Sequence, residues 1–305
     1  MGRLTGKVAV VFGAGPNIGG TIAHFIGREG AKVVVVDLNL PVAEETAQFL
    51  KSRGYECTAM QGNAVSEPSV SSVIEKTVAH YGRVDAIVNM AGKIHWAPVT
   101  EMELEDWTAS LTSFPTAGML TTKHAARAMI KAGHGGSIIH ILSTAAHFGE
   151  ASGAAYCSAK AGLLNFARCA AMDLAHDQIR VNTITPCSME HQLWTLMKDE
   201  VEDPNFVPPN TRSFYSRDDY LKMIPLERFC RPSDLAWAAV FLASDESTFL
   251  TGVDIPVDGG LRFKYPTWRP GDHTGVNISD YLNQIKITRY GEEGEPLRAA
   301  PSQAK

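Results

Sequence analysis

The chain has 305 residues, 45% of them hydrophobic and 20% charged, a composition that supports a sizeable core without disulfides. Its 28 basic and 33 acidic side chains give a net charge of −5 with no basic block, which argues against nucleic acid or a membrane surface as a partner. Five scattered cysteines without a CxxC pair, no long apolar run and no signal segment predict a cytoplasmic protein without a membrane span.

Short apolar runs alternate with longer amphipathic segments in the first two thirds of the chain. The predicted strands are residues 8–12, 33–36, 84–88, 137–142 and 180–184, and the predicted helices are residues 18–30, 41–53, 67–81, 103–131 and 154–176. Because the strands are continuously apolar, both faces of their sheet should be covered by helices. This order predicts an α/β fold with a doubly wound, Rossmann-type parallel sheet.

The alternation breaks after residue 186. Residues 187–224 are rich in aromatic side chains and methionine, and we interpret this long connection as a substrate lid. A helix at 232–244 and a strand at 253–257 then complete the sheet. We therefore expect a catalytic domain over residues 1–261 and a C-terminal extension over 262–305, whose end has the composition of a disordered segment.

A glycine-rich turn from Gly13 to Gly19 joins the first strand to the first helix. Such a turn lets backbone N–H groups approach a pyrophosphate at a helix N-terminus. Asp37 ends the second strand, where a carboxylate can accept hydrogen bonds from adenosine ribose hydroxyls. It would repel a 2′-phosphate, and Leu38 offers no cation, so NAD is predicted rather than NADP. Taken singly, each feature is also compatible with a plain turn and a solvated charge.

Tyr156 and Lys160 lie four residues apart at the start of a predicted helix and share one face of it. A tyrosine pKa near 10 is too high for a general base at neutral pH, and a neighbouring ammonium would lower it. Ser143 follows the strand 137–142, at the edge where doubly wound sheets bind ligands. Its hydroxyl could hold a substrate oxygen, with Thr144 as the competing hydroxyl. An ordinary surface pair of tyrosine and lysine is the alternative.

Over residues 5 to about 261 the chain resembles the short-chain dehydrogenase/reductase (SDR) family. The motifs that carry the resemblance are Gly13, Asn17-Ile18-Gly19, Asp37, Asn89-Met90-Ala91-Gly92, Ser143, Tyr156 with Lys160, Arg180-Val181-Asn182, Pro186, Thr251-Gly252 and Val257-Asp258-Gly259-Gly260. The resemblance implies that Ser143 stabilises the substrate oxygen and Tyr156 is the general acid/base. It implies that Lys160 lowers the tyrosine pKa and binds the nicotinamide ribose. The implied NAD site comprises Gly13, Asn17, Ile18, Gly19, Asp37, Asn63, Ala64, Asn89, Ala91, Gly92, Tyr156, Lys160, Pro186 and Met189.

Several positions depart from the family pattern. Asn17 stands where a second glycine is usual, although asparagine tolerates a positive φ, and Asn63 replaces a customary aspartate. Phe114 falls where the family has a helix asparagine, whose main-chain carbonyl holds a water leading from the lysine to solvent. We expect this proton relay to persist through backbone atoms, with a kink at Pro115 and Ser113 as a polar helper. A non-catalytic NAD-binding paralogue is the alternative.

Residues after the strands at 84–88 and 137–142, together with the lid, should line the substrate pocket: His95, Trp96, Ala145, His147, Phe148 and Trp194. This largely aromatic set favours a bulky lipophilic alcohol or ketone, cyclic or aromatic. The prediction is an NAD-dependent alcohol dehydrogenase without a metal, with an epimerase or dehydratase as the alternative. The resemblance implies a homotetramer or homodimer built on the helices at 103–131 and 154–176.

Overall fold

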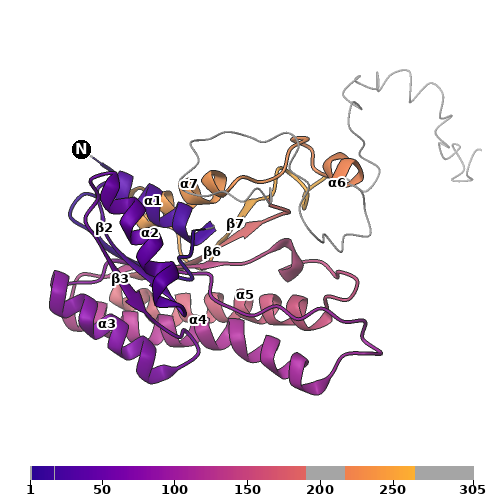
Figure 1. Ribbon diagram of the computed structural model, residues 1–305, viewed down its shortest axis with the longest axis horizontal. Helices are drawn as coiled ribbons and strands as arrows, with labels where there is room; N and C mark the ends of the chain where they lie inside the picture. The colour runs from indigo at the N-terminus through magenta and orange to yellow at the C-terminus, as the bar shows by residue number, and fades with distance from the viewer. Residues whose placement is uncertain (1, 17, 190–216, 265–305) are drawn as a thin grey trace, which may run out of the picture. The chain divides into compact units, whose positions relative to one another are not determined.

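A parallel sheet of seven strands forms the centre of the fold in the computed structural model, which describes residues 2–16, 18–189 and 217–264 (Figure 1). In spatial order the strands are β3 (Cys57–Gln61), β2 (Lys32–Asp37), β1 (Val8–Phe12), β4 (Ala86–Asn89), β5 (Gly136–Ile141), β6 (Ile179–Pro186) and β7 (Asp254–Val257). Every neighbouring pair is parallel. The strand order reverses at β1 and β4, and doubly wound sheets bind ligands at the carboxyl edge of that position.

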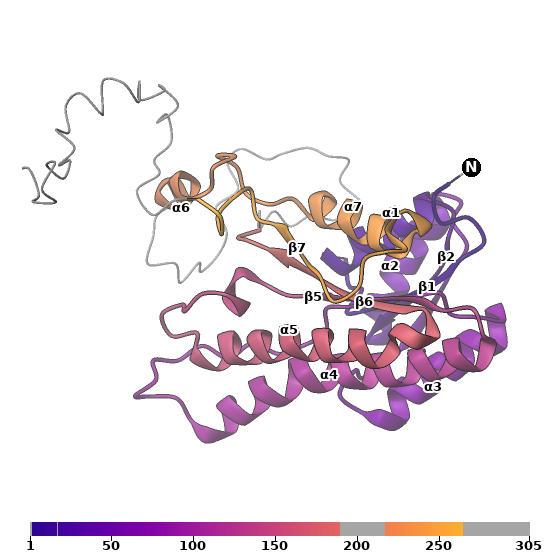
Figure 2. The ribbon, with the colours of Figure 1, turned by 180° about the vertical axis from the view of Figure 1, so that it is seen from behind.

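Helices cover both faces of the sheet, as Figures 1 and 2 show. One face carries α1 (Ile18–Arg28), α2 (Leu40–Ser52) and α7 (Pro232–Ala243), and the other carries α3 (Glu67–Tyr81), α4 (Leu104–Ala132) and α5 (Ala154–Leu174). The short elements are η1 (Thr144–Ala146), η2 (Ala175–Asp177), α6 (Arg217–Met223) and η3 (Asp245–Ser247). Because both faces are covered, all five residues of β1 are buried, and the predicted doubly wound fold is confirmed.

The predicted helices and strands are present, with bounds that agree to within two residues. The sequence does not predict β3, because this edge strand has a single neighbour, β2, and only Cys57 of its five residues is buried. It also does not predict α6, which falls inside the segment interpreted as a lid. Residues 190–216 of the predicted lid, with Trp194 among them, lie outside the described residues.

The chain divides into one unit of Met1–Phe263 and another of Lys264–Lys305. Of the second unit, only Lys264 is among the described residues. Arg262 and Phe263 belong to the first unit, two residues beyond the boundary expected from the sequence. Within the described part of the chain, no helix is both long enough and apolar enough to span a membrane.

Candidate active site

The turn between β1 and α1 requires glycine at Gly13 for its backbone conformation and at Gly19 for its close packing. Gly13 has a φ of +77°, and a Cβ there would lie 3.1 Å from the side chain of Met90. A Cβ on Gly19 would lie 2.1 Å from the carbonyl oxygen of Gly13, a contact that only glycine avoids. The turn therefore presents bare backbone at the start of α1, at Ile18, as a pyrophosphate site requires. Asn17 lies outside the described residues.

Asp37 ends β2 beside this turn. Its Oδ1 accepts a hydrogen bond from the backbone N–H of Asn39 at 3.0 Å, and its Oδ2 lies 3.6 Å from the position of a Cβ on Gly15. On the adjacent strand, Asn63 and the buried Ala64 follow β3, and Asn63 accepts a hydrogen bond from a backbone N–H through Oδ1. This arrangement of a carboxylate, a bare turn and small neighbours fits the adenosine end of a dinucleotide.

The end of β4 approaches the glycine turn from the other side. Asn89 is buried, and its Oδ1 accepts a hydrogen bond from the backbone N–H of Ala91 at 3.2 Å. A Cβ on Gly92 would lie 2.0 Å from the ring of Phe114, so only glycine fits at this position. The predicted cofactor residues at the ends of β1, β2 and β4 are thus brought to one edge of the sheet.

The first residues of the predicted lid are described. Pro186 ends β6 and is buried. Met189 forms an isolated parallel bridge with Cys230, whose backbone N–H donates to the carbonyl oxygen of Ser188 at 3.0 Å. This bridge joins the start of the predicted lid to the segment before α7.

Ser143 and Tyr156 meet at the carboxyl edge of the sheet. Ser143 follows β5 and caps η1 through its Oγ. Tyr156 lies in the first turn of α5, close enough to Ser143 for the serine side chain to lower the pKa of its phenol. The rings of Trp96 and Phe114 flank the tyrosine, each with its centroid 5.5 Å from that of the Tyr156 ring. The two hydroxyls that the sequence singled out therefore lie together, beside two aromatic side chains.

Lys160 lies one turn of α5 beyond Tyr156 and is only 4% exposed. Its Nζ donates a hydrogen bond to the carbonyl oxygen of Ile141 at 2.8 Å. The same Nζ lies 4.1 Å from the centroid of the Phe114 ring, a cation–π contact, and 5.8 Å from the centroid of the Tyr156 ring. The ring of Phe114 thus fills the space between Lys160, Tyr156 and Gly92.

The pKa of Tyr156 is shifted in the direction opposite to the sequence prediction. Burial raises the pKa of Tyr156 to about 12, and the lowering by the Ser143 side chain offsets this only in part. Burial also lowers the pKa of Lys160 to about 7, because the buried ammonium loses its hydration. The expectation that Lys160 lowers the tyrosine pKa is wrong for the protein alone, because desolvation dominates both groups while the ammonium contacts Ile141 and Phe114.

The loop after β4 forms a wall beside Tyr156. The backbone N–H of Ala97 donates to the carbonyl oxygen of Ser152 at 3.0 Å. Trp96 packs against Gly153, where a Cβ would lie 2.7 Å from the indole ring. These contacts attach one end of the loop to the segment that enters α5.

The other end of this loop is attached to α4. The backbone N–H of Lys93 donates to Oγ of Ser113 at 3.0 Å. Nδ1 of His95 lies 2.9 Å from a carboxylate oxygen of Asp106, in the first turn of α4. The Ser113 hydroxyl, expected as a helper in the proton relay, is therefore bonded to the main chain of the loop. Asp106 is not among the residues predicted from the sequence, because its only signal is its place in a helix N-terminal turn.

The remaining predicted pocket residues follow β5. Ala145 is buried, whereas Phe148 is 48% exposed. His147 directs its Nε2 to the carboxylate of Asp254, at 3.1 Å, and to the guanidinium of Arg262. Burial lowers the pKa of His147, and the nearby Arg262 lowers it further.

Arg262 lies at the centre of a buried ion-pair network that is not predicted from the sequence. Its guanidinium lies 2.7 Å from Asp254 and 3.1 Å from Asp258, and all three side chains are at most 7% exposed. Thr183 and Thr185 of β6 both donate to Oδ1 of Asp254 at 2.7 Å. The network joins β6, β7 and the end of the first unit to the loop that follows Ser143.

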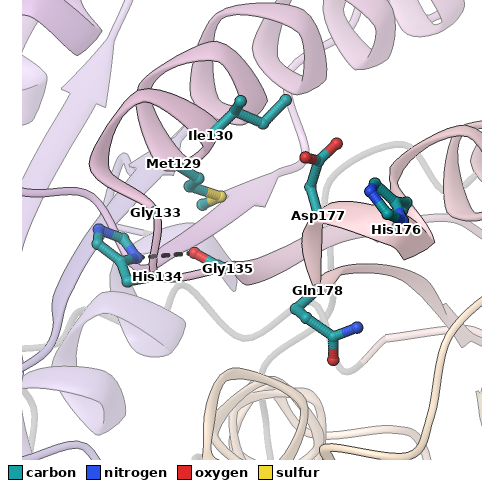
Figure 3. A pocket seen from close by; sticks show the side chains of 8 residues that line it. All are labelled: Met129, Ile130, Gly133, His134, Gly135, His176, Asp177 and Gln178. Atoms are coloured by element: carbon teal, nitrogen blue, oxygen red, sulfur yellow. Dashed lines mark hydrogen bonds between the residues drawn. The ribbon is translucent and has the colours of Figure 1, made fainter.

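A surface hollow of about 400 Å³ lies elsewhere on the molecule (Figure 3). Its lining includes Met129, His134 and Asp177, near the amino ends of β5 and β6. Because parallel sheets bind ligands at the carboxyl edge, where Ser143 lies, this hollow is not the candidate active site. Among the described residues, no group of three His, Cys, Asp or Glu side chains could hold a metal ion.

Known proteins resemble this chain over most of its length. A family model described as enoyl-(acyl carrier protein) reductase matches residues 13–262. D-threitol dehydrogenase of Mycolicibacterium smegmatis is 34% identical over 268 residues, covering 86% of this chain and 95% of the relative. The 2,5-dichloro-2,5-cyclohexadiene-1,4-diol dehydrogenase LinX of Sphingobium indicum is 33% identical over 258 residues, covering 85% and 97%. A short-chain type dehydrogenase/reductase of Mycobacterium marinum matches in structure with a TM-score of 0.74 at 27% identity, covering 86% of this chain and 97% of that chain.

The matched span contains both the glycine turn and the contact between Ser143 and Tyr156. Proteins of this kind are oxidoreductases that bind a nicotinamide dinucleotide, and the bare turn at Gly13 and Gly19 fits that cofactor. The chain belongs to the short-chain dehydrogenase/reductase family.

Proposed function

We propose that the protein interconverts a secondary alcohol and a ketone with NAD as its cofactor. The observation that carries this proposal is the contact between Tyr156 and Ser143, beside the dinucleotide-binding edge of the sheet. The Ser143 hydroxyl would hold the substrate oxygen, and Tyr156 would take or return its proton. When bound, the nicotinamide supplies the hydride acceptor or donor.

Tyr156 can take a proton from the substrate only if its pKa is lowered in the working complex. With its pKa raised to about 12, Tyr156 is not a base at neutral pH in the protein alone. Lys160 is the cation one helical turn away, and its ammonium is held by Ile141 and Phe114. We propose that in the working complex the ammonium turns from Ile141 toward the phenol, which would favour the phenolate.

Several side chains support a lipophilic cyclic or aromatic substrate. Trp96 lies beside Tyr156, Phe148 is exposed in the loop after β5, and Phe114 closes the site from the side of α4. The relative LinX is named for a cyclic diol and another relative for the linear polyol D-threitol. We favour the cyclic class for this chain, because aromatic surfaces bind apolar rings better than they bind hydrated linear polyols.

A substrate panel tests the proposal. The formation of NADH is measured by absorbance with cyclic, aromatic and linear secondary alcohols. We expect turnover of a cyclic alcohol, and a loss of about 10²–10⁴-fold in Tyr156→Phe, which keeps the ring but removes the acid/base. NADH binding by the variant, followed by fluorescence, shows that the site is intact.

Two other results would contradict the proposed reaction. Conversion of a substrate without net NADH formation would indicate an epimerase or dehydratase. Tight NADH binding without turnover of any substrate, unchanged in Tyr156→Phe, would indicate a non-catalytic NAD-binding protein.

We also propose a cytoplasmic homotetramer or homodimer built on α4 and α5. Met119 and Ile130 of α4 and Met172 of α5 are exposed apolar side chains that such an interface would cover. Light scattering should give two or four times the subunit mass of 33.0 kDa. A particle of the subunit mass would contradict this assembly.

A further inference from the structure

His95, in the loop beside Tyr156, has one ring nitrogen bonded and the other without a partner. Its Nδ1 lies 2.9 Å from the Asp106 carboxylate, which places the imidazole proton on Nδ1. Its Nε2 is buried and has no hydrogen-bond partner among the described residues. In the neutral imidazole, a carboxylate that holds the proton on one ring nitrogen leaves the other nitrogen as a hydrogen-bond acceptor. Burying such an acceptor without a partner is unfavourable, so this nitrogen is suited to a ligand.

A second unpartnered polar atom lies on the helix that faces this loop. Ser110 is fully buried, and its Oγ has no hydrogen-bond partner among the residues that the structure describes. Asp106, Ser110 and Ser113 follow one another at helical spacing on one face of α4. Asp106 holds His95 and Ser113 holds the backbone of Lys93, so Ser110 lies between two contacts with the loop.

The loop is also the part of the structure that flanks the reacting phenol. Trp96, the next residue after His95, contacts the Tyr156 ring. His95 therefore directly precedes a ring that contacts Tyr156, and Ser110 lies one helical turn before Phe114, whose ring contacts the same tyrosine. Together they offer an acceptor, Nε2, and a hydroxyl that can donate, Oγ. A ligand hydroxyl matches both, because it donates one hydrogen bond and accepts another, whereas a carbon or a ketone oxygen cannot satisfy Nε2.

We propose that His95 and Ser110 bind a second hydroxyl group of the substrate, so that the enzyme prefers a diol to the matching mono-alcohol. This inference rests on the proposed dehydrogenase function and specifies its substrate class. Asp106 is a positioning residue, since it acts only by holding the imidazole of His95. The reacting hydroxyl remains at Ser143 and Tyr156.

Matched substrates test the proposal. The kcat/KM for NAD-dependent oxidation is measured with cyclohexanol and with the 1,2-, 1,3- and 1,4-cyclohexanediols. We expect at least one diol to be preferred over cyclohexanol by about tenfold or more, because a buried polar site discriminates strongly against a substrate that lacks its partner. His95→Leu should reduce this diol preference by about tenfold.

Conservative and matched variants separate recognition from folding. His95→Gln keeps an amide near the position of Nε2 and should recover part of the diol preference. Asp106→Asn should lower the preference through KM for the diol more than through kcat. Glu105→Gln makes the same chemical change at the neighbouring, exposed position and should leave the preference as in the wild type. NADH binding measured for each variant confirms that the cofactor site is folded.

The other outcomes of these experiments would overturn either the inference or the proposed function. If the diol preference is the same in His95→Leu as in the wild type, the two atoms hold only a buried water, and the inference is overturned. The same holds if the wild type prefers cyclohexanol. If the wild type oxidises no alcohol of either kind although it binds NADH, the proposed function itself fails, and the inference fails with it.

Discussion

Nζ of Lys160 lies 4.1 Å from the centroid of the Phe114 ring, so the buried ammonium of the candidate site rests on an aromatic face. The family resemblance places an asparagine at this position, with a polar route from the lysine to solvent. In this chain the ring contacts Lys160, Tyr156 and Gly92 at once. Phe114 is therefore part of the electrostatic environment of the site as well as of its packing.

Replacing Phe114 by leucine should lower the pKa of Lys160 still further. The aromatic face stabilises the ammonium by about 0.5–2 kcal/mol, and its loss corresponds to about one pH unit. The measurement is a titration of the lysine 13Cε signal by NMR. Phe114→Tyr, which keeps the ring, should leave the pKa near that of the wild type, and an unchanged pKa in Phe114→Leu would show that the cation–π contact has no energetic role.

The burial of Lys160 should make stability rise with pH above neutrality. Its pKa is about 7 in the folded protein and 10.5 as the ordinary value, so between these pH values the unfolded state binds more protons. The contribution of Lys160 to the free energy of unfolding then increases with pH, by at most about 1.4 kcal/mol per pH unit. Because the pKa of Tyr156 is raised in the folded protein, its contribution to the free energy of unfolding decreases with pH above about pH 10.

Urea unfolding at several pH values between about 7 and 9 measures this effect. Lys160→Met lacks the titrating group, so the free energy of unfolding of the wild type minus that of the variant should increase across this range. A difference that stays constant with pH would mean that Lys160 keeps its proton in the folded protein.

Arg262→Met should destabilise the protein strongly. The change leaves Asp254 and Asp258 buried without their cation, which costs about 3–5 kcal/mol for a broken buried pair. Arg228→Met is the matched control, because the pair of Arg228 with Asp234 is considerably more exposed and should contribute about 1 kcal/mol or less. Chemical denaturation compares the two variants, and equal losses would contradict a special role for the buried network.

Asp37 should determine whether the enzyme prefers NAD or NADP as its cofactor. With a carboxylate beside the glycine turn and Leu38 next to it, the wild type should have the higher kcat/KM with NAD. The double variant Asp37→Ser with Leu38→Arg removes a negative charge and adds a positive one, so it should shift the NAD/NADP ratio toward NADP by about tenfold or more. Steady-state kinetics with both cofactors measure this ratio. A wild type that prefers NADP would overturn the NAD assignment.

The sequence alone determined the order of the elements and the fold class, because both depend on local patterns. The unbroken apolar run of β1, the glycines before α1 and the four-residue spacing of Tyr156 and Lys160 can each be recognised within a few residues. The edge strand β3 lacked such a pattern, because it is mostly half-buried and has a single neighbouring strand.

Only the tertiary structure decided the electrostatics of the site. The pKa values of Tyr156 and Lys160 are set by burial, and burial depends on helices and strands that pack from distant parts of the chain. The contact of His147 with Arg262 joins residues 115 positions apart, and no local pattern encodes it. Spacing along the chain fixes which groups can share a turn or a helix face, whereas desolvation and long-range ion pairs arise only when the packed structure removes water from those groups.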